Sequence, residues 1–136
     1  MVESISPRDT WATLQSNSEA QLVDVRTDAE WTYVGLPDLS AAGKQPLLVS
    51  WQIFPTMQVD SAFVDHLREA GLAPDQPLYF LCRTGSRSLT AAQVAERAGF
   101  TRSHNVAHGF EGPMDAAGQR GHISGWKADG LPWRQG

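Results

Sequence analysis

Residues 78–100, LYFLCRTGSRSLTAAQVAERAGF, constrain the possible folds of this chain more than any other segment. They begin with a run of apolar residues, which is typical of a strand buried on both faces. A short loop follows, and apolar side chains then recur at helical spacing until Gly99 ends the pattern. A buried strand that leads through so short a loop into a helix is typical of a parallel α/β sheet.

The rest of the chain repeats this alternation of strand and helix. Strands are expected at 20–27, at 46–51, where the apolar run indicates a second buried strand, and at 102–109. Helices are expected to begin at Ser6 and Pro7, at Asp28, and at Asp60 or Ser61. The Gly-rich segment 110–136 is expected to hold one or two short helices and an irregular tail. This order predicts an α/β fold, a small mostly parallel β-sheet flanked by helices on both faces, in a single domain over 1–136.

Composition excludes several classes of function. Hydrophobic residues make up 41% of the 136 residues and charged residues 19%, which is globular composition. The net charge of -4 argues against nucleic-acid binding, which needs a dense basic face. One cysteine excludes an intramolecular disulfide and a zinc site built on several thiolates. The N-terminus has no signal-peptide pattern, and no apolar run approaches the length of a membrane span, so a cytoplasmic protein is expected.

The one cysteine, Cys82, stands where the predicted strand ends. Ligands of open parallel sheets bind beyond the carboxyl ends of the strands. Gly85 permits a tight turn in which backbone amides converge, and the helix that follows adds its own free amides and positive dipole end. Such surroundings favour a thiolate, and Arg83 and Arg87 can bind an anionic substrate. A cysteine at a strand end is often only a small buried hydrophobe, but the Gly, hydroxyl and Arg residues gathered on one side favour a reactive thiol.

A reactive thiol in such a loop is compatible with chemistry in which the cysteine carries one extra sulfur atom, and with two other functions. Phosphotyrosine phosphatases and arsenate reductases of that kind need an Arg as the sixth residue after the cysteine, but that residue is Ser88 and the Arg comes one place early, at Arg87. The tighter loop fits one extra sulfur atom better than a phosphate. A non-catalytic binding or redox-sensing module is the third possibility, although a redox sensor usually has a resolving cysteine, which this chain lacks.

The loop and helix resemble the active-site segment of single-domain rhodaneses, which are sulfurtransferases. The segments LVDVRTDAEW (22–31), NVAHGFEG (105–112) and GWKADGLPW (125–133) are similar to further segments of the same family, in the same order. The resemblance implies that Cys82 accepts a sulfane sulfur as a persulfide, from a donor such as thiosulfate or another persulfide. It also implies transfer to a small thiol, cyanide or a protein acceptor, with no cofactor.

The resemblance also implies roles for the residues around Cys82. Arg83 and Arg87 would attract anionic donors. Asp24 and Arg26 would support the site, with Arg26 paired to Glu30 and Asp24 ordering the base of the site. The loop whose backbone amides would hold the persulfide consists of Arg83, Thr84, Gly85, Ser86, Arg87 and Ser88.

Two segments depart from the family pattern, 35–51 and the stretch that separates 105–112 from 125–133. Phe110, beside Gly109 and Gly112, is predicted to wall the pocket. His104 and His108 suggest metal ligands, but four residues along a strand span about 13 Å, too far to share a metal ion directly. No metal site is therefore predicted.

Overall fold

The computed structural model describes residues 2–135 and is built around one five-stranded sheet. Each neighbouring pair of its strands is parallel. In spatial order the strands are β1 (Glu3–Ile5), β8 (Ser103–Val106), β7 (Leu78–Leu81), β2 (Gln21–Asp24) and β4 (Leu47–Leu48). The carboxyl ends of β2 and β7 therefore lie at one edge of the sheet, and Cys82 follows the end of β7.

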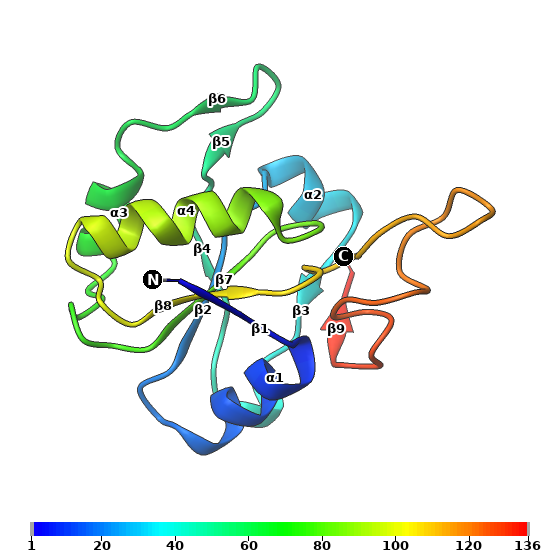
Figure 1. Ribbon diagram of the computed structural model, residues 1–136, viewed down its shortest axis with the longest axis horizontal. Helices are drawn as coiled ribbons and strands as arrows, with labels where there is room; N and C mark the ends of the chain where they lie inside the picture. Colours follow the sequence, from blue (N-terminus) through cyan, green and yellow to red (C-terminus); the bar gives the residue numbers. More distant parts are fainter. Residues whose placement is uncertain (1, 136) are drawn as a thin grey trace.

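Helices cover both faces of this sheet (Figure 1). Helix α1 (Pro7–Ser16) lies on one face, and α3 (Phe63–Glu69) and α4 (Ser86–Arg97) lie on the other. Successive side chains of β7 alternate between the two cores, so that Leu81 packs in the same core as Leu14 of α1 while Phe80 packs with Phe63 of α3. The predicted architecture, a mostly parallel sheet with helices on both faces, is confirmed.

Local signals placed several element ends correctly. Helix α1 begins after Ser6, whose side chain accepts a hydrogen bond from the amide of Asp9. Helix α2 (Asp28–Tyr33) begins where expected, after Thr27. For α3 the predicted cap was wrong. The cap position is Ala62, and the carboxylate of Asp60 accepts a hydrogen bond from the Ala62 amide in the turn that precedes the helix.

The predicted buried strand over 46–51 is only partly present. Leu47 and Leu48 form β4, and the amides of Val49 and Trp51 still donate to the carbonyls of Asp24 and Val25. Leu48 is 40% exposed because β4 is the edge strand of the sheet. The chain then leaves the sheet and forms a projecting hairpin of β5 (Gln52–Ile53) and β6 (Gln58–Val59) (Figure 1). Of the predicted strand residues that follow β4, only Val49 and Trp51 are buried.

The C-terminal segment differs from expectation more strongly. No helix is assigned between residues 110 and 135, where turns lead to β9 (Trp133–Arg134), which pairs antiparallel with β3 (Leu36–Pro37). Several glycines in this stretch adopt positive φ, which a right-handed helix does not allow: Gly112, Gly118, Gly121, Gly125 and Gly130. A short 3₁₀ helix, η1 (Ser40–Ala42), lies in the connection between β3 and β4.

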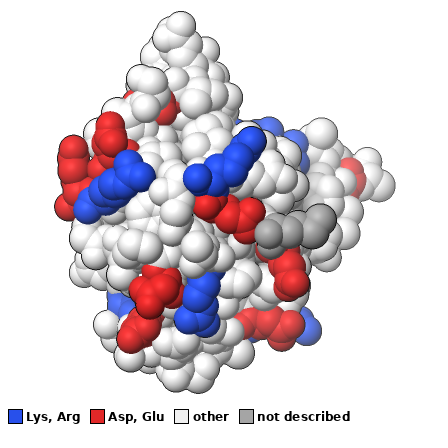
Figure 2. Space-filling model, turned by 60° about the vertical axis from the view of Figure 1, so that its left-hand side comes forward, with Lys and Arg blue, Asp and Glu red and all other residues white. Residues whose placement is uncertain are grey.

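The surface carries charges of both signs. On the face drawn in Figure 2, Lys and Arg side chains are interspersed with Asp and Glu side chains. The β5–β6 hairpin has no charged residue between Gln52 and Val59. Within residues 2–135, no helix has the length and apolar character needed to cross a membrane.

A buried ion pair lies at the end of β2. The Nη2 atom of Arg26 is 2.7 Å from Oδ2 of Asp24, and neither side chain is exposed. The Asp24 carboxylate also accepts hydrogen bonds from Nε and from the backbone amide of Arg26. Arg26 donates a further bond to the Gly35 carbonyl, and its guanidinium lies 4.3 Å from the centre of the Phe110 ring. The pair therefore ties β2 to the chain before β3 and to the segment that follows β8.

Removing the guanidinium tests this tie. Arg26→Met leaves the Asp24 carboxylate buried without its partner, and we expect it to lower the free energy of unfolding by about 3–5 kcal/mol in urea denaturation. The double variant Asp24→Asn/Arg26→Met should be less destabilised because it buries no unpaired charge. A single variant no less stable than the double variant would contradict this assignment.

Candidate functional site

The thiol of Cys82 lies between the end of β7 and the start of α4, as the sequence predicts. Its Sγ atom accepts a hydrogen bond of 3.1 Å from the amide of Gly85 and lies 3.1 Å from the hydroxyl oxygen of Ser88. The cysteine residue has no exposed surface. Its sulfur is therefore held by groups on the loop and on the first turn of the helix.

Gly85 makes this arrangement possible. It is the N-cap of α4 with φ of 103°, a conformation that residues with a Cβ rarely adopt. A Cβ at this position would lie 3.2 Å from the amide nitrogen of His108. The amides of Ser86, Arg87 and Ser88 precede the bond from the Leu89 amide to the Gly85 carbonyl, so they have no partner within the helix. The positive end of α4 thus lies beside the sulfur.

The segment after β8 closes against the backbone of the loop. The Phe110 amide donates to the Cys82 carbonyl at 2.8 Å, and the amides of Glu111 and Gly112 donate to the Arg83 carbonyl at 3.0 and 3.1 Å. Gly109 approaches so closely that a Cβ on it would lie 2.6 Å from the carbonyl oxygen of Arg83. The contact between the segment after β8 and the loop is therefore made by backbone atoms.

Phe110 does not wall the pocket, contrary to prediction. Its side chain is fully buried in the core on the α1 side of the sheet, where its ring meets Arg26 and the edge of Trp133. Cys82 belongs to the core on the other side. The backbone of Phe110 reaches the site while its side chain points away from it. Asp24 and Arg26 consequently support the loop indirectly, because Arg26 packs on the ring of the residue whose amide holds the Cys82 carbonyl.

The predicted pairing of Arg26 with Glu30 is wrong. Arg26 is bound to Asp24, and Glu30 instead receives both terminal nitrogens of Arg87, at 2.8 and 3.0 Å. The short helix α2 turns the Glu30 side chain toward α4 instead of back toward β2. The Arg87 guanidinium is thus fixed by a forked ion pair, and its charge is partly neutralised before any substrate arrives.

Glu30 also belongs to the start of its own helix. Its Oε1 atom accepts from the amide and hydroxyl of Thr27, and the hydroxyl of Thr27 accepts from the Glu30 amide, which completes a capping box. Burial alone would raise the pKa of Glu30, but the hydrogen bonds and charge of Arg87 hold that pKa below its ordinary value of 4.5. The sequence signal for this residue was the Thr27-x-x-Glu30 spacing.

A hollow of about 360 Å³ opens over the loop. Cys82 does not line it, so a reagent that enters the hollow meets the loop side chains before the sulfur. Met57, from the turn of the β5–β6 hairpin, lines it too and was not predicted from the sequence. The lining residues are Glu30, Met57, Arg83, Thr84, Ser86 and Arg87.

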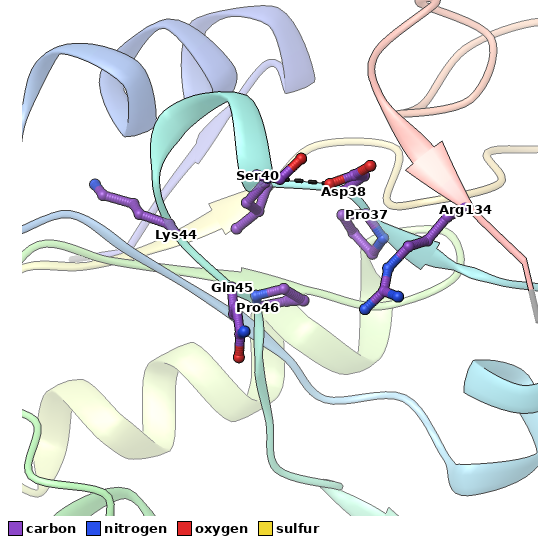
Figure 3. A pocket seen from close by; sticks show the side chains of 8 residues that line it. Pro37, Asp38, Ser40, Lys44, Gln45, Pro46 and Arg134 are labelled. Carbon is purple, nitrogen blue, oxygen red and sulfur yellow. Dashed lines mark hydrogen bonds between the residues drawn. The ribbon is translucent and has the colours of Figure 1, made fainter.

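A second hollow lies near the amino ends of β2 and β4 and includes no residue of the cysteine loop (Figure 3). Lys44, which lines it, donates from Nζ to the carbonyls of Asn17 and Ala20, both at 2.6 Å. This ammonium group therefore holds the turn between α1 and β2 together. Figure 3 also shows the bond from the Ser40 amide to Asp38, which orders the start of η1.

Ser88, the sixth residue after the cysteine, has a structural role in the site. Its side chain is fully buried, and its hydroxyl lies 2.6 Å from Oδ1 of Asn105 on β8 as well as next to the sulfur. Nothing in the sequence pattern alone had assigned a role to Asn105. Among residues 2–135, no group of three or more His, Cys, Asp or Glu side chains is placed to hold a metal ion. His104, considered above as a ligand, stacks on Tyr79 at 4.7 Å.

Comparison with known proteins links this site to a family. The family model of the STR4 middle domain matches residues 2–136. An uncharacterized protein of Rickettsia prowazekii (strain Madrid E) is 34% identical over 135 residues, which cover 98% of each chain. Rhodanese-like domain-containing protein 4, chloroplastic, of Arabidopsis thaliana is 25% identical over 129 residues, which span 94% of this chain and 25% of that protein.

Solved structures agree with this relationship. The crystal structure of Rv0390 from M. tuberculosis matches with a TM-score of 0.91 and 47% identity, covering 99% of this chain and 98% of that one. The polysulfide-sulfur transferase homodimer of Wolinella succinogenes shares the fold, with a TM-score of 0.70, 24% identity and coverage of 99% and 80%. The fold is therefore rhodanese-like, as the sequence predicted.

A pair of glycine variants tests the close approach under the loop. Gly109 and Gly43 have similar φ, 65° and 68°, but a Cβ meets no atom within 4 Å at Gly43. We expect Gly43→Ala to lower the free energy of unfolding by about 1 kcal/mol from backbone strain alone. Gly109→Ala should lower it by at least about 3 kcal/mol because the Cβ also displaces the loop. Equal losses in urea denaturation would contradict a close contact at Gly109.

The Glu30–Arg87 pair predicts a pH dependence of stability. Because the pKa of Glu30 is lowered by folding, the pair contributes stability above the ordinary value of 4.5 and loses it as the pH falls through the lowered pKa. Wild type should therefore exceed Glu30→Gln by about 1 kcal/mol near neutral pH, and the difference should disappear in acid. A difference that stays constant down to strongly acidic pH would show that Glu30 acts through something other than its charge.

Proposed function

The chain belongs to the family of the STR4 middle domain, and we propose that it is a sulfurtransferase whose Cys82 carries a sulfane sulfur as a persulfide. The observation that carries this proposal is the position of the Cys82 sulfur at the start of α4, where the Gly85 amide already donates to it. A sulfur anion is favoured there by the helix dipole and by amides that have no partner within the helix.

The reaction divides into two displacements. In the first, the Cys82 thiolate attacks the outer sulfur of thiosulfate or of a persulfide donor. A sulfur–sulfur bond forms on Cys82, the bond inside the donor breaks, and sulfite or a thiolate leaves with the electron pair. In the second, cyanide, a small thiol or a protein thiol attacks the outer sulfur, and Cys82 leaves as the thiolate. No net oxidation occurs, so one cysteine is sufficient and no cofactor is needed.

The loop residues take different parts in this proposal. The amides of Arg83 to Ser88 surround the outer sulfur of the persulfide and stabilise its charge. Arg83 is exposed at the hollow and attracts an anionic donor. Arg87 has a smaller part in attracting the donor than its position in the sequence suggests, because Glu30 holds its guanidinium. The Glu30 carboxylate also makes the hollow less favourable to a donor of high negative charge.

The phosphatase alternative fits this geometry less well. A phosphate would need a free guanidinium at the sixth position, but Ser88 there is fully buried and turned toward the sulfur. The neighbouring Arg87 is tied to Glu30 by two hydrogen bonds. A redox sensor usually has a resolving cysteine near the reactive one, which this sequence does not supply. We place the activity in the cytoplasm, where small thiols keep a lone cysteine reduced and accept its sulfur.

Steady-state sulfur transfer tests the proposal. Wild-type protein should form thiocyanate from thiosulfate and cyanide, and Cys82→Ser should form none. Arg83→Ala should raise the KM for thiosulfate roughly tenfold, as expected for one lost hydrogen bond to a charged group. Arg102→Ala is the matched control, because Arg102 is also exposed but precedes β8 at the opposite edge of the sheet.

The same preparations are assayed for hydrolysis of an aryl phosphate. No thiocyanate with several donors, together with Cys82-dependent phosphate release, would overturn the proposal in favour of the phosphatase. Full thiocyanate formation by the Cys82→Ser protein would show that Cys82 does not carry the transferred sulfur.

A further inference from the structure

The hydroxyl of Ser88 lies between two acceptors. Its oxygen is 3.1 Å from the Cys82 sulfur and 2.6 Å from Oδ1 of Asn105. A hydroxyl group has one proton, so it donates to one of these atoms at a time. Ser88 has no exposed surface and Asn105 is 3% exposed, so water does not readily replace either partner.

The orientation of Asn105 is set by its other contacts. Its Nδ2 atom donates to the Gly85 carbonyl and to the hydroxyl of Ser4, both at 3.1 Å. A flipped amide would turn Oδ1 toward the Gly85 carbonyl oxygen and place two acceptors against each other. Oδ1 is therefore aimed at Ser88. Ser4 lies opposite Asn105 in the parallel pairing of β1 with β8, so the edge strand fixes this amide.

We infer that Asn105 is a positioning residue that competes with the Cys82 sulfur for the Ser88 proton. When Cys82 is a thiol, its S–H donates to the Ser88 oxygen and Ser88 donates to Asn105. When the thiol proton leaves to solvent, the Ser88 hydroxyl turns to the thiolate and Asn105 loses its donor. Asn105 therefore favours the thiol, whereas Ser88 favours the thiolate.

A consequence for sulfur transfer rests on the proposed function. In a persulfide the negative charge moves to the outer sulfur, and the inner sulfur becomes a weak acceptor. The Ser88 hydroxyl then turns back and donates to Oδ1 of Asn105, whose distance of 2.6 Å from the hydroxyl oxygen is typical of a strong hydrogen bond. Ser88 thus stabilises the thiolate before sulfur is accepted, and Asn105 takes its hydrogen bond afterwards, while the amides of the loop hold the new charge.

Other charges act on the same sulfur and are the same in every variant proposed below. Burial alone would lower the pKa of Arg87. Its hydrogen bond to Glu30 and the nearby anions, Asp24 among them, outweigh burial and raise that pKa above its ordinary value. The charged and titratable groups around Cys82 are Arg83 in the loop, Arg87 on α4, Glu30 on α2, Asp24 on β2 and His108 after β8.

The pH dependence of alkylation by iodoacetamide tests the inference without any sulfur donor. Ser88→Ala should raise the pH of half-maximal alkylation rate by about one unit, the order expected for one hydrogen bond to an anion. Asn105→Leu should lower it, because Ser88 then donates to the sulfur without competition. In the double variant Ser88→Ala/Asn105→Leu, the Asn105 substitution should cause no further shift of the midpoint, since no hydroxyl proton remains to be shared.

Further variants keep the test decisive if Asn105→Leu folds poorly. Ser4→Ala removes one anchor of the amide at an exposed position and should shift the midpoint in the same direction as Asn105→Leu, by less. Ser103→Ala is the matched control, because Ser103 is also buried on β8 but donates to the Phe100 carbonyl. It should leave the midpoint unchanged.

The outcomes separate this inference from the proposed function. If the shifts of the two single variants add in the double variant, or if Ser4→Ala raises the alkylation midpoint, the proposed competition for the proton is wrong. If the predicted shifts appear but no variant or wild type transfers sulfur, the hydrogen-bond switch stands and the proposed function fails. If wild type transfers sulfur but the midpoints do not move, the proposed function stands and the switch is wrong.

Discussion

The hydrogen bond from the Gly85 amide to the Cys82 sulfur is the interaction on which the site depends. It depends on the left-handed conformation of Gly85 at the start of α4, where a Cβ would be strained and would lie only 3.2 Å from the amide nitrogen of His108. The Phe110 amide and the close approach of Gly109 hold the turn after β8 against the loop. The position of the sulfur thus depends on backbone contacts between the loop that follows β7 and the segment that follows β8.

The two faces of the sheet have separate tasks. On one face, Cys82, Ser88 and Asn105 form a polar cluster that reaches from α4 to the edge strand. On the other face, the buried pair of Asp24 and Arg26 packs against the Phe110 ring. Phe110 connects the two, since its amide belongs to the site and its side chain to the opposite core. The aspartate and arginine next to a strand end are therefore part of the scaffold that holds the loop.

Sequence reasoning succeeded where the signal was local. The strand that ends at Cys82, the glycine loop and the cap at Ser6 each depend on residues within a few positions of one another. It failed where partners are distant in sequence. Glu30 and Arg87 are 57 positions apart, and Ser4 and Asn105 are 101 apart, so neither contact leaves a periodic trace. The edge strand β1 was also missed, because it has only three residues, and the strand predicted over 46–51 is reduced to the two residues of β4.

The central claim is that Cys82 carries a sulfane sulfur, and the intact mass of the protein before and after thiosulfate tests it most directly. The account predicts that wild type gains the mass of one sulfur atom, that cyanide or a small thiol removes it, and that Cys82→Ser gains none. A wild-type mass unchanged by thiosulfate and by persulfide donors, or an equal gain in Cys82→Ser, would contradict it.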